Sequence, residues 1–149
     1  MSGIEWPSAP TSSGMIVDVP DNYPTPPAGP PVLLVASLPC NVNISWTVPS
    51  PYSTTLGGTF QLRSYVESIG PGQELQIGPT IIVPVVPGTT AYNATITVPG
   101  GTLLGEGQIY NGVPVSGVYE IVAVLQHLNP APTVVSGYAE DTLKMFRSP

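Results

Sequence analysis

Short apolar runs separated by turn residues dominate this chain and limit the folds that it can adopt. The sequence contains 20 prolines and 16 glycines in 149 residues, and most of them lie between apolar runs. From residue 32 onward these runs recur at a spacing of roughly ten residues, which is typical of a β-sandwich or a barrel. The expected strands cover residues 32–38, 41–48, 59–69, 75–77, 80–86, 90–98, 117–128 and 134–146.

Two of these runs alternate between apolar and polar residues without error. Successive side chains of a strand point to opposite faces, so this alternation predicts strands with one buried face. The expected inward residues are Val42, Ile44, Trp46 and Val48 in the first run, and Tyr92, Ala94, Ile96 and Val98 in the second. Pro79 and Pro84 predict an edge strand or a bulge between residues 75 and 86, because proline cannot donate to a ladder.

Residues 117–128, GVYEIVAVLQHL, carry apolar residues on both faces of the expected strand. The spacing of the same residues also fits one face of a helix. β-Branched residues and a tyrosine fill the segment and every neighbouring run is a predicted strand, so a strand is favoured. Val118, Val122 and Val124 would then point away from the core, and something must cover them.

The number and length of the runs predict an all-β domain, a two-sheet antiparallel β-sandwich of immunoglobulin-like type with seven to eight strands. The stretch Gly117-Val118-Tyr119 resembles the tyrosine corner of such sandwiches, and Trp46 is the expected core anchor. Cys40 is the only cysteine. An internal disulfide, and with it an antibody-type domain, is therefore excluded.

The composition changes near residue 31, and this change predicts two parts. Residues 1–31 hold eight prolines, which favour extended backbone. We expect this part to form an extended, proline-rich N-terminal arm, and residues 32–149 to form the sandwich domain. Four apolar side chains at wide spacing would anchor the arm to a neighbour: Trp6, Ile16, Val17 and Tyr23.

The balance of charge excludes two classes of partner. The net charge is −6, and only three residues are basic: Arg63, Lys144 and Arg147. Three basic residues cannot neutralise a phosphate track or hold an anionic membrane surface, so neither nucleic acid nor membrane binding is expected. No apolar run approaches the roughly 20 residues of a membrane span. The N-terminus lacks the basic and apolar regions of a signal peptide, and the compartment stays open.

The residue types that catalysis requires are scarce. His127 and Cys40 are the only residues of their kinds, whereas a zinc site needs three or four ligands. We expect Cys40 to be a buried free thiol and His127 to be a satisfied or exposed side chain. No G-x-S-x-G, Walker or G-x-G-x-x-G motif lies in a suitable context. The sequence therefore predicts no enzyme, no cofactor and no metal.

Two further patterns have weaker interpretations. Glu67 and Glu74 flank a turn and could approach one another, but calcium needs six to eight oxygen ligands. Asn43 and Asn93 begin glycosylation sequons and fall on outward positions of their strands. Such sequons are used only in proteins that eukaryotes secrete.

The apolar outer positions lead to a functional hypothesis. Contiguous exposed apolar patches usually mark interaction sites. We therefore expect a non-catalytic structural subunit that self-assembles or docks onto a larger protein assembly of capsid, sheath or filament type. Its partner would be itself or another structural protein. The interface candidates are Trp6, Ile16, Val17, Tyr23, Ile82, Val118, Val122 and Val124.

The alternative hypothesis is a monomeric binding or adhesion module. Residues 49–58 and 99–116 would then form its recognition surface. Tyr52, Leu104 and Tyr110 are the candidate contact residues within these loops.

Overall fold

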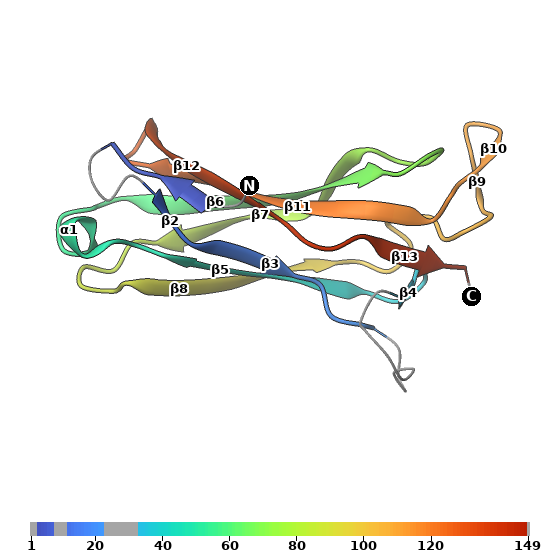
Figure 1. The fold of residues 1–149 in the computed structure, drawn as a ribbon, viewed down its shortest axis with the longest axis horizontal. Helices are drawn as coiled ribbons and strands as arrows, with labels where there is room; N and C mark the ends of the chain where they lie inside the picture. Colours follow the sequence, from blue (N-terminus) through green and yellow to red (C-terminus); the bar gives the residue numbers. More distant parts are fainter. Residues whose placement is uncertain (1–2, 8–11, 23–32, 149) are drawn as a thin grey trace.

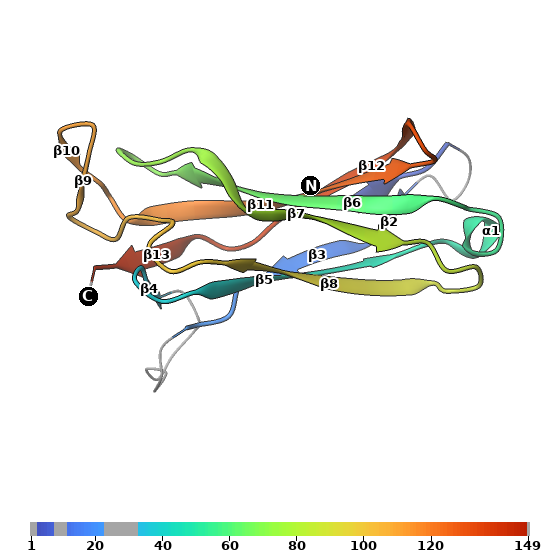
Figure 2. The same ribbon diagram turned by 180° about the vertical axis from the view of Figure 1, so that it is seen from behind.

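The computed structural model describes residues 3–7, 12–22 and 33–148, and their regular structure is almost entirely β-strand. Two sheets lie face to face in an elongated sandwich (Figures 1 and 2). The larger sheet contains β1 (Gly3–Glu5), β2 (Ser12–Ser13), β4 (Leu33–Val35), β6 (Thr59–Ser68), β7 (Leu75–Pro84), β11 (Val118–Leu128), β12 (Pro132–Glu140) and β13 (Lys144–Arg147). The smaller sheet contains β3 (Met15–Asp18), β5 (Cys40–Thr47) and β8 (Ala91–Val98). The prediction of an all-β sandwich is confirmed.

Strand β11 is the centre of the larger sheet. It pairs with β6 along its whole length, and on its other edge with β12 and then β13, all antiparallel. Beyond these neighbours, β7 pairs with β6, β1 and β2 extend the sheet past β12, and β4 runs parallel to β13. The smaller sheet has the antiparallel order β3-β5-β8. A hairpin of β9 (Ile109–Tyr110) and β10 (Val113–Pro114) stands at one end, and the helical turn α1 (Ser50–Ser53) lies at the other (Figure 1).

The core consists of the inward-pointing side chains of both sheets, which alternate with outward-pointing ones along each strand. Trp46 of β5 is buried and stacks on Tyr92 of β8 with ring centroids 5.5 Å apart. Phe60 of β6 meets Trp46 edge-on from the opposite sheet, again at 5.5 Å. Every second residue of β11 completes the interior: Tyr119, Ile121, Ala123, Leu125 and His127 are all buried. The strand predicted at residues 117–128 and the role of Trp46 as a core anchor are therefore confirmed.

Strands β1 and β3 belong to the sandwich, although the sequence predicts that both lie in a separate arm, and residues 1–2, 8–11 and 23–31 of that arm lie outside the described residues. Strand β1 pairs with β12, and β3 pairs with β5. Trp6 and Val17 are each 5% exposed, so they are core residues and not anchors for a neighbour. The physical reason that this segment packs as a strand is its period of two, because buried positions alternate with exposed ones along β3. Tyr23 lies outside the described residues.

The prolines of β7 have the predicted effect. This strand pairs with β6 alone, so it is an edge of the larger sheet in the part of the chain that the structure describes. Its register shifts opposite Arg63, between Leu62 and Ser64. At this point Gly78 adopts φ +69°, and an added Cβ would lie only 2.5 Å from the side chain of Ile96 in β8. Glycine therefore lets the edge of one sheet approach the other closely.

Several expected strands differ in extent from the observed ones. Of the described residues 33–38, Leu33–Val35 form a strand. The runs 75–77 and 80–86, expected to be separate, form the single strand β7. The single bent strand expected at 134–146 is two strands, β12 and β13, and the break lies at residues 141–143, not near Gly137. The hydroxyl of Tyr119 donates to the backbone carbonyl of Leu104 at 2.8 Å, which lies 15 residues upstream and is not the local backbone that a tyrosine corner bonds.

A buried ion pair holds the break between β12 and β13. Lys144 Nζ lies 3.4 Å from Asp141 Oδ2, and the two side chains are only 2% and 10% exposed. The same carboxylate oxygen accepts a hydrogen bond from the backbone N–H of Val19 at 2.9 Å. The pair therefore joins the C-terminal strand to the segment that follows β3.

We expect Lys144→Met to lower the free energy of unfolding by about 3–5 kcal/mol, because it leaves the Asp141 carboxylate buried without its cation. Urea unfolding measures the change. Arg147→Met is the matched control, since Arg147 lies on the same strand but is exposed, and it should change the stability by less than about 0.5 kcal/mol. Equal effects of the two substitutions would contradict a structural role for the buried pair.

Candidate functional site

The outer face of the larger sheet is the surface that points away from the smaller sheet. Val118, Val122 and Val124 lie on it and are half-buried, because the inner positions of β11 are held by other residues. The register places Tyr65 of β6 opposite Val122, and Tyr138 of β12 opposite Val124. The described N-terminal strands do not cover this face, since β1 and β2 extend the sheet edge and β3 lies in the other sheet. The outer face therefore carries an apolar strip, which we define as Val118, Val122, Val124, Tyr65 and Tyr138.

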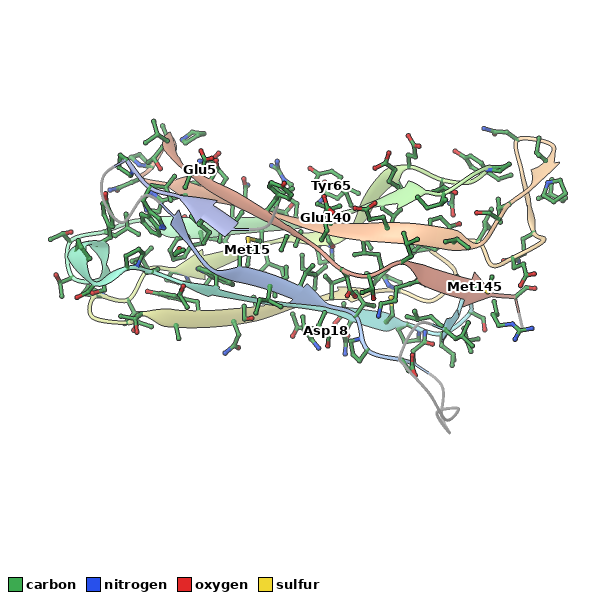
Figure 3. All side chains as sticks on the ribbon, viewed as in Figure 1. Glu5, Met15, Asp18, Tyr65, Glu140 and Met145 are labelled. Carbon is green, nitrogen blue, oxygen red and sulfur yellow. The ribbon has the colours of Figure 1, made fainter. Side chains whose placement is uncertain are left out.

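Four carboxylates lie at one end of the apolar strip, around Val122, whereas Arg63 lies opposite Val124 further along it. Glu120 lies directly opposite Glu67 in the ladder of β11 and β6, and Glu140 lies opposite Val122. Glu74 lines the same open hollow as Tyr65, Glu67 and Val122, about 560 Å³ in volume. We name the residues Glu67, Glu74, Glu120 and Glu140 the acidic rim. In Figure 3, Tyr65 and Glu140 lie on the outer side of the larger sheet, whereas Asp18 lies on the side of the smaller one.

The rim carboxylates are close enough to affect one another's protonation. The pKa of Glu120 is raised above its ordinary value, first because its side chain shares a hydrogen bond with Glu140, and further by partial burial and by the charges of Glu140 and Glu67. A hydrogen bond between two carboxyl groups requires that one of them hold a proton. The rim therefore concentrates negative charge beside an apolar surface.

The remaining interface candidates are dispersed. Ile82 of β7 is 50% exposed and lies opposite Gln61, at the edge of the outer face. Ile16 is 66% exposed but lies on β3 of the smaller sheet, together with Asp18. Ile82, Val118, Val122 and Val124 thus share the outer face, with Ile82 at the level of Gln126 and far from Val118, whereas Ile16 lies on the smaller sheet.

The two loops of the alternative hypothesis do not form one surface. Residues 49–58 follow β5 and residues 99–116 follow β8, and because these strands are antiparallel the loops lie at opposite ends of the sandwich (Figures 1 and 2). Tyr52 is half-buried and stacks on Trp6 with centroids 4.7 Å apart. Leu104 is half-buried, whereas Tyr110 on the β9–β10 hairpin is 38% exposed. Only the hairpin end presents a predicted contact residue that is exposed.

The two candidate reactive side chains have structural environments. His127 is 2% exposed, its Nε2 lies 2.6 Å from the carbonyl oxygen of Gly57, and its Nδ1 lies 2.9 Å from Thr133 Oγ1. It joins two loops at one end of the sandwich. Cys40 is buried and free, and burial raises its pKa to about 11. Within residues 3–7, 12–22 and 33–148, no group of three or more His, Cys, Asp or Glu side chains could hold a metal ion.

Two other features of the described structure bear on partners. The sequon asparagines face outward on the smaller sheet, where Asn43 Oδ1 accepts a hydrogen bond from Thr95 Oγ1 at 2.9 Å. None of the helical structure described has the length and the apolar character that a bilayer span requires.

Glu120→Gln tests the raised pKa of the rim. Because the folded protein binds the Glu120 proton more tightly than the unfolded chain does, this residue contributes stability below its ordinary pKa of 4.5, and the contribution is lost as the pH rises through the higher folded-state pKa. We expect the melting temperature of the variant, relative to wild type, to rise across this window. Asp18→Asn is the control, and a flat difference for Glu120→Gln would contradict the coupling.

Cys40 should be unreactive in the folded protein. A pKa of about 11 leaves about one thiolate in a thousand molecules at about pH 8, and burial shields it further. We expect a thiol-specific chromogenic disulfide to label Cys40 only after unfolding in urea. Rapid stoichiometric labelling under native conditions would show that the thiol is accessible and would contradict the structural assignment.

The outer face offers an apolar strip, an acidic rim and an open hollow, which is an arrangement suited to contact with another macromolecule. Comparisons of the chain with protein-family models, with curated proteins and with solved structures found no match.

Proposed function

We propose that this protein is a non-catalytic structural subunit that packs through the outer face of its larger sheet against another protein. The partner is a copy of itself or a component of a larger assembly of capsid, sheath or filament type. The observation that carries the proposal is the position of Val118, Val122 and Val124, which lie half-buried on an open face beside two tyrosines.

The energetics of burial support this proposal. Removing apolar surface from water contributes roughly 25 cal/mol per Å², so a strip of valines and tyrosines is a source of binding energy once a partner covers it. The edge strand β7 carries Pro79 and Pro84, which hinder the addition of a further strand to this edge. Packing through the face of the sheet is therefore favoured over pairing at this edge.

We also propose that the sandwich is of immunoglobulin-like type. The buried Trp46 between the sheets supports this subtype.

A photo-crosslinking amino acid placed at Tyr65 tests the proposed contact. In cells that express the protein together with its natural partners, we expect irradiation to give a covalent adduct of higher mass, because Tyr65 lies beside Val122 on the outer face. The same amino acid at Ile16, exposed on the smaller sheet, is the matched control and should give little adduct.

Val122→Thr combined with Val124→Thr should abolish the Tyr65 adduct, because threonine keeps the shape and strand propensity of valine but not its apolar methyl. Mass spectrometry of the adduct identifies the partner as a second copy or as another protein. The proposal would be contradicted by a folded protein that gives no adduct at Tyr65, or by an adduct that the Val122 and Val124 substitutions leave unchanged.

The exposed hairpin supports a second candidate function. Ile109 is 61% exposed, Tyr110 38% and Val113 48%, on a two-residue turn at Asn111-Gly112 that keeps them at the end of the sandwich. A binding module would use this end alone. Under this alternative, Ile109→Ser with Tyr110→Ser would abolish partner capture, whereas the Val122 and Val124 substitutions would leave it intact.

A further inference from the structure

We infer that the outer face of the larger sheet takes a basic protein partner, one that presents arginine or lysine side chains around an apolar centre, and not a second copy of this chain. The inference rests on the proposed function and selects between its two kinds of partner. The apolar strip provides the contact area, and the acidic rim favours a basic partner over a second copy of the chain.

The described part of the chain offsets the charge of the rim only in part. Among residues 3–7, 12–22 and 33–148, none of the four rim carboxylates forms an ion pair with a basic side chain. Lys144 is buried with Asp141 on the inner side of the sheet. Arg63 is the nearest cation in the ladder, and it lies opposite Val124, not opposite a rim residue. With one arginine against four glutamates, this part of the face carries a formal charge of −3 when all groups are ionised.

A second copy docked through the same face would bring two such surfaces together. Eight rim carboxylates would then meet two arginines in a contact from which water is largely excluded. Like charges at close range in a low dielectric repel strongly, and like-charge juxtaposition is a common means of rejecting wrong partners. The face is therefore poorly suited to self-association at neutral pH.

The geometry of the rim suits a guanidinium group. Directly opposed residues of an antiparallel pair have Cβ atoms about 4.5–5.5 Å apart, so Glu67 and Glu120 can converge on one ligand. Arginine presents several donors in a planar fork and binds carboxylates in two-point contacts. A partner arginine would offset the repulsion between the carboxylates that the ladder places beside one another.

The apolar part of the face requires that the partner be broader than a cation. Val122 and Tyr65 border the rim, and Val124 and Tyr138 continue the strip along the sheet. Nucleic acid and anionic lipid carry the same sign of charge as the rim, so they do not fit. A protein surface with an apolar centre and basic edges matches both parts of the face.

Three labelled peptides serve as probes in fluorescence anisotropy. One repeats paired arginines and valines, RRVVRRVV, and the others replace all arginines or all valines by serine. We expect the wild-type protein to bind RRVVRRVV about tenfold or more tightly than either control peptide, with weaker binding as salt increases. Equal binding of all three peptides would overturn the inference.

Matched double variants locate the binding. Glu67→Gln with Glu120→Gln should weaken RRVVRRVV binding about tenfold, whereas Asp18→Asn with Glu106→Gln removes two acids elsewhere and should leave it unchanged. Val122→Thr with Val124→Thr should weaken it too, and Ile16→Thr should not. Equal losses from the two acid pairs would show only a response to net charge and would overturn the inference.

Light scattering separates the failure of this inference from the failure of the proposed function. A wild-type protein that self-associates at neutral pH and low salt, and loses this association with the Val122 and Val124 substitutions, overturns the basic-partner inference but supports the proposed function. A monomer that binds RRVVRRVV through the rim supports the inference. A monomer that binds no probe, and gives no Tyr65 adduct in cells, contradicts both.

Discussion

Strand β11 pairs along both of its edges, and this constraint determines what each face of the larger sheet presents. The odd-numbered residues from 119 to 127 point toward the smaller sheet and are buried. The even-numbered residues of β11 must therefore point outward. A shift of one residue would exchange the two faces and place Glu120 in the core, at a large cost in free energy. The outer position of the three valines follows from this register and not from a shortage of space inside.

The N-terminal segment and the C-terminal strand stabilise one another through a feature that is costly on its own. Burying Lys144 and Asp141 away from water carries a desolvation penalty that their attraction repays only in good geometry. The backbone N–H of Val19 donates a hydrogen bond to the same Asp141 carboxylate, and this bond holds the segment after β3. Trp6 adds a second attachment, because its Nε1–H donates to Ser13, whose hydroxyl donates to the Thr47 carbonyl.

Much of the sandwich could be predicted from periodicity, and the errors have a common physical cause. The alternation in residues 41–48 and 90–98 predicted buried Trp46 and Ile96 correctly, because a period of two is a local property. The alternation of Met15, Val17 and Val19 was equally present but stood among prolines, whose density suggested an arm. The approach of Glu67 and Glu74 across a turn could be predicted, and both line one hollow. The addition of Glu120 and Glu140 could not, because these residues meet Glu67 only through strand register, which depends on long-range pairing.

The two outer faces of the sandwich meet water with different chemistry, and the contrast bears on function. On the smaller sheet, Asn41 and Asn43 accept hydrogen bonds from Thr97 and Thr95, a neutral polar ladder that is satisfied without a partner. On the larger sheet, Glu120 lies between Val118 and Val122 on β11, and Glu67 and Glu140 lie on the strands beside it. Half-buried valines do not stabilise a face that stays in water, and unpaired glutamates destabilise a core. We propose that this apolar centre beside charged groups is covered by a partner part of the time, and that its charge restricts which partner can cover it.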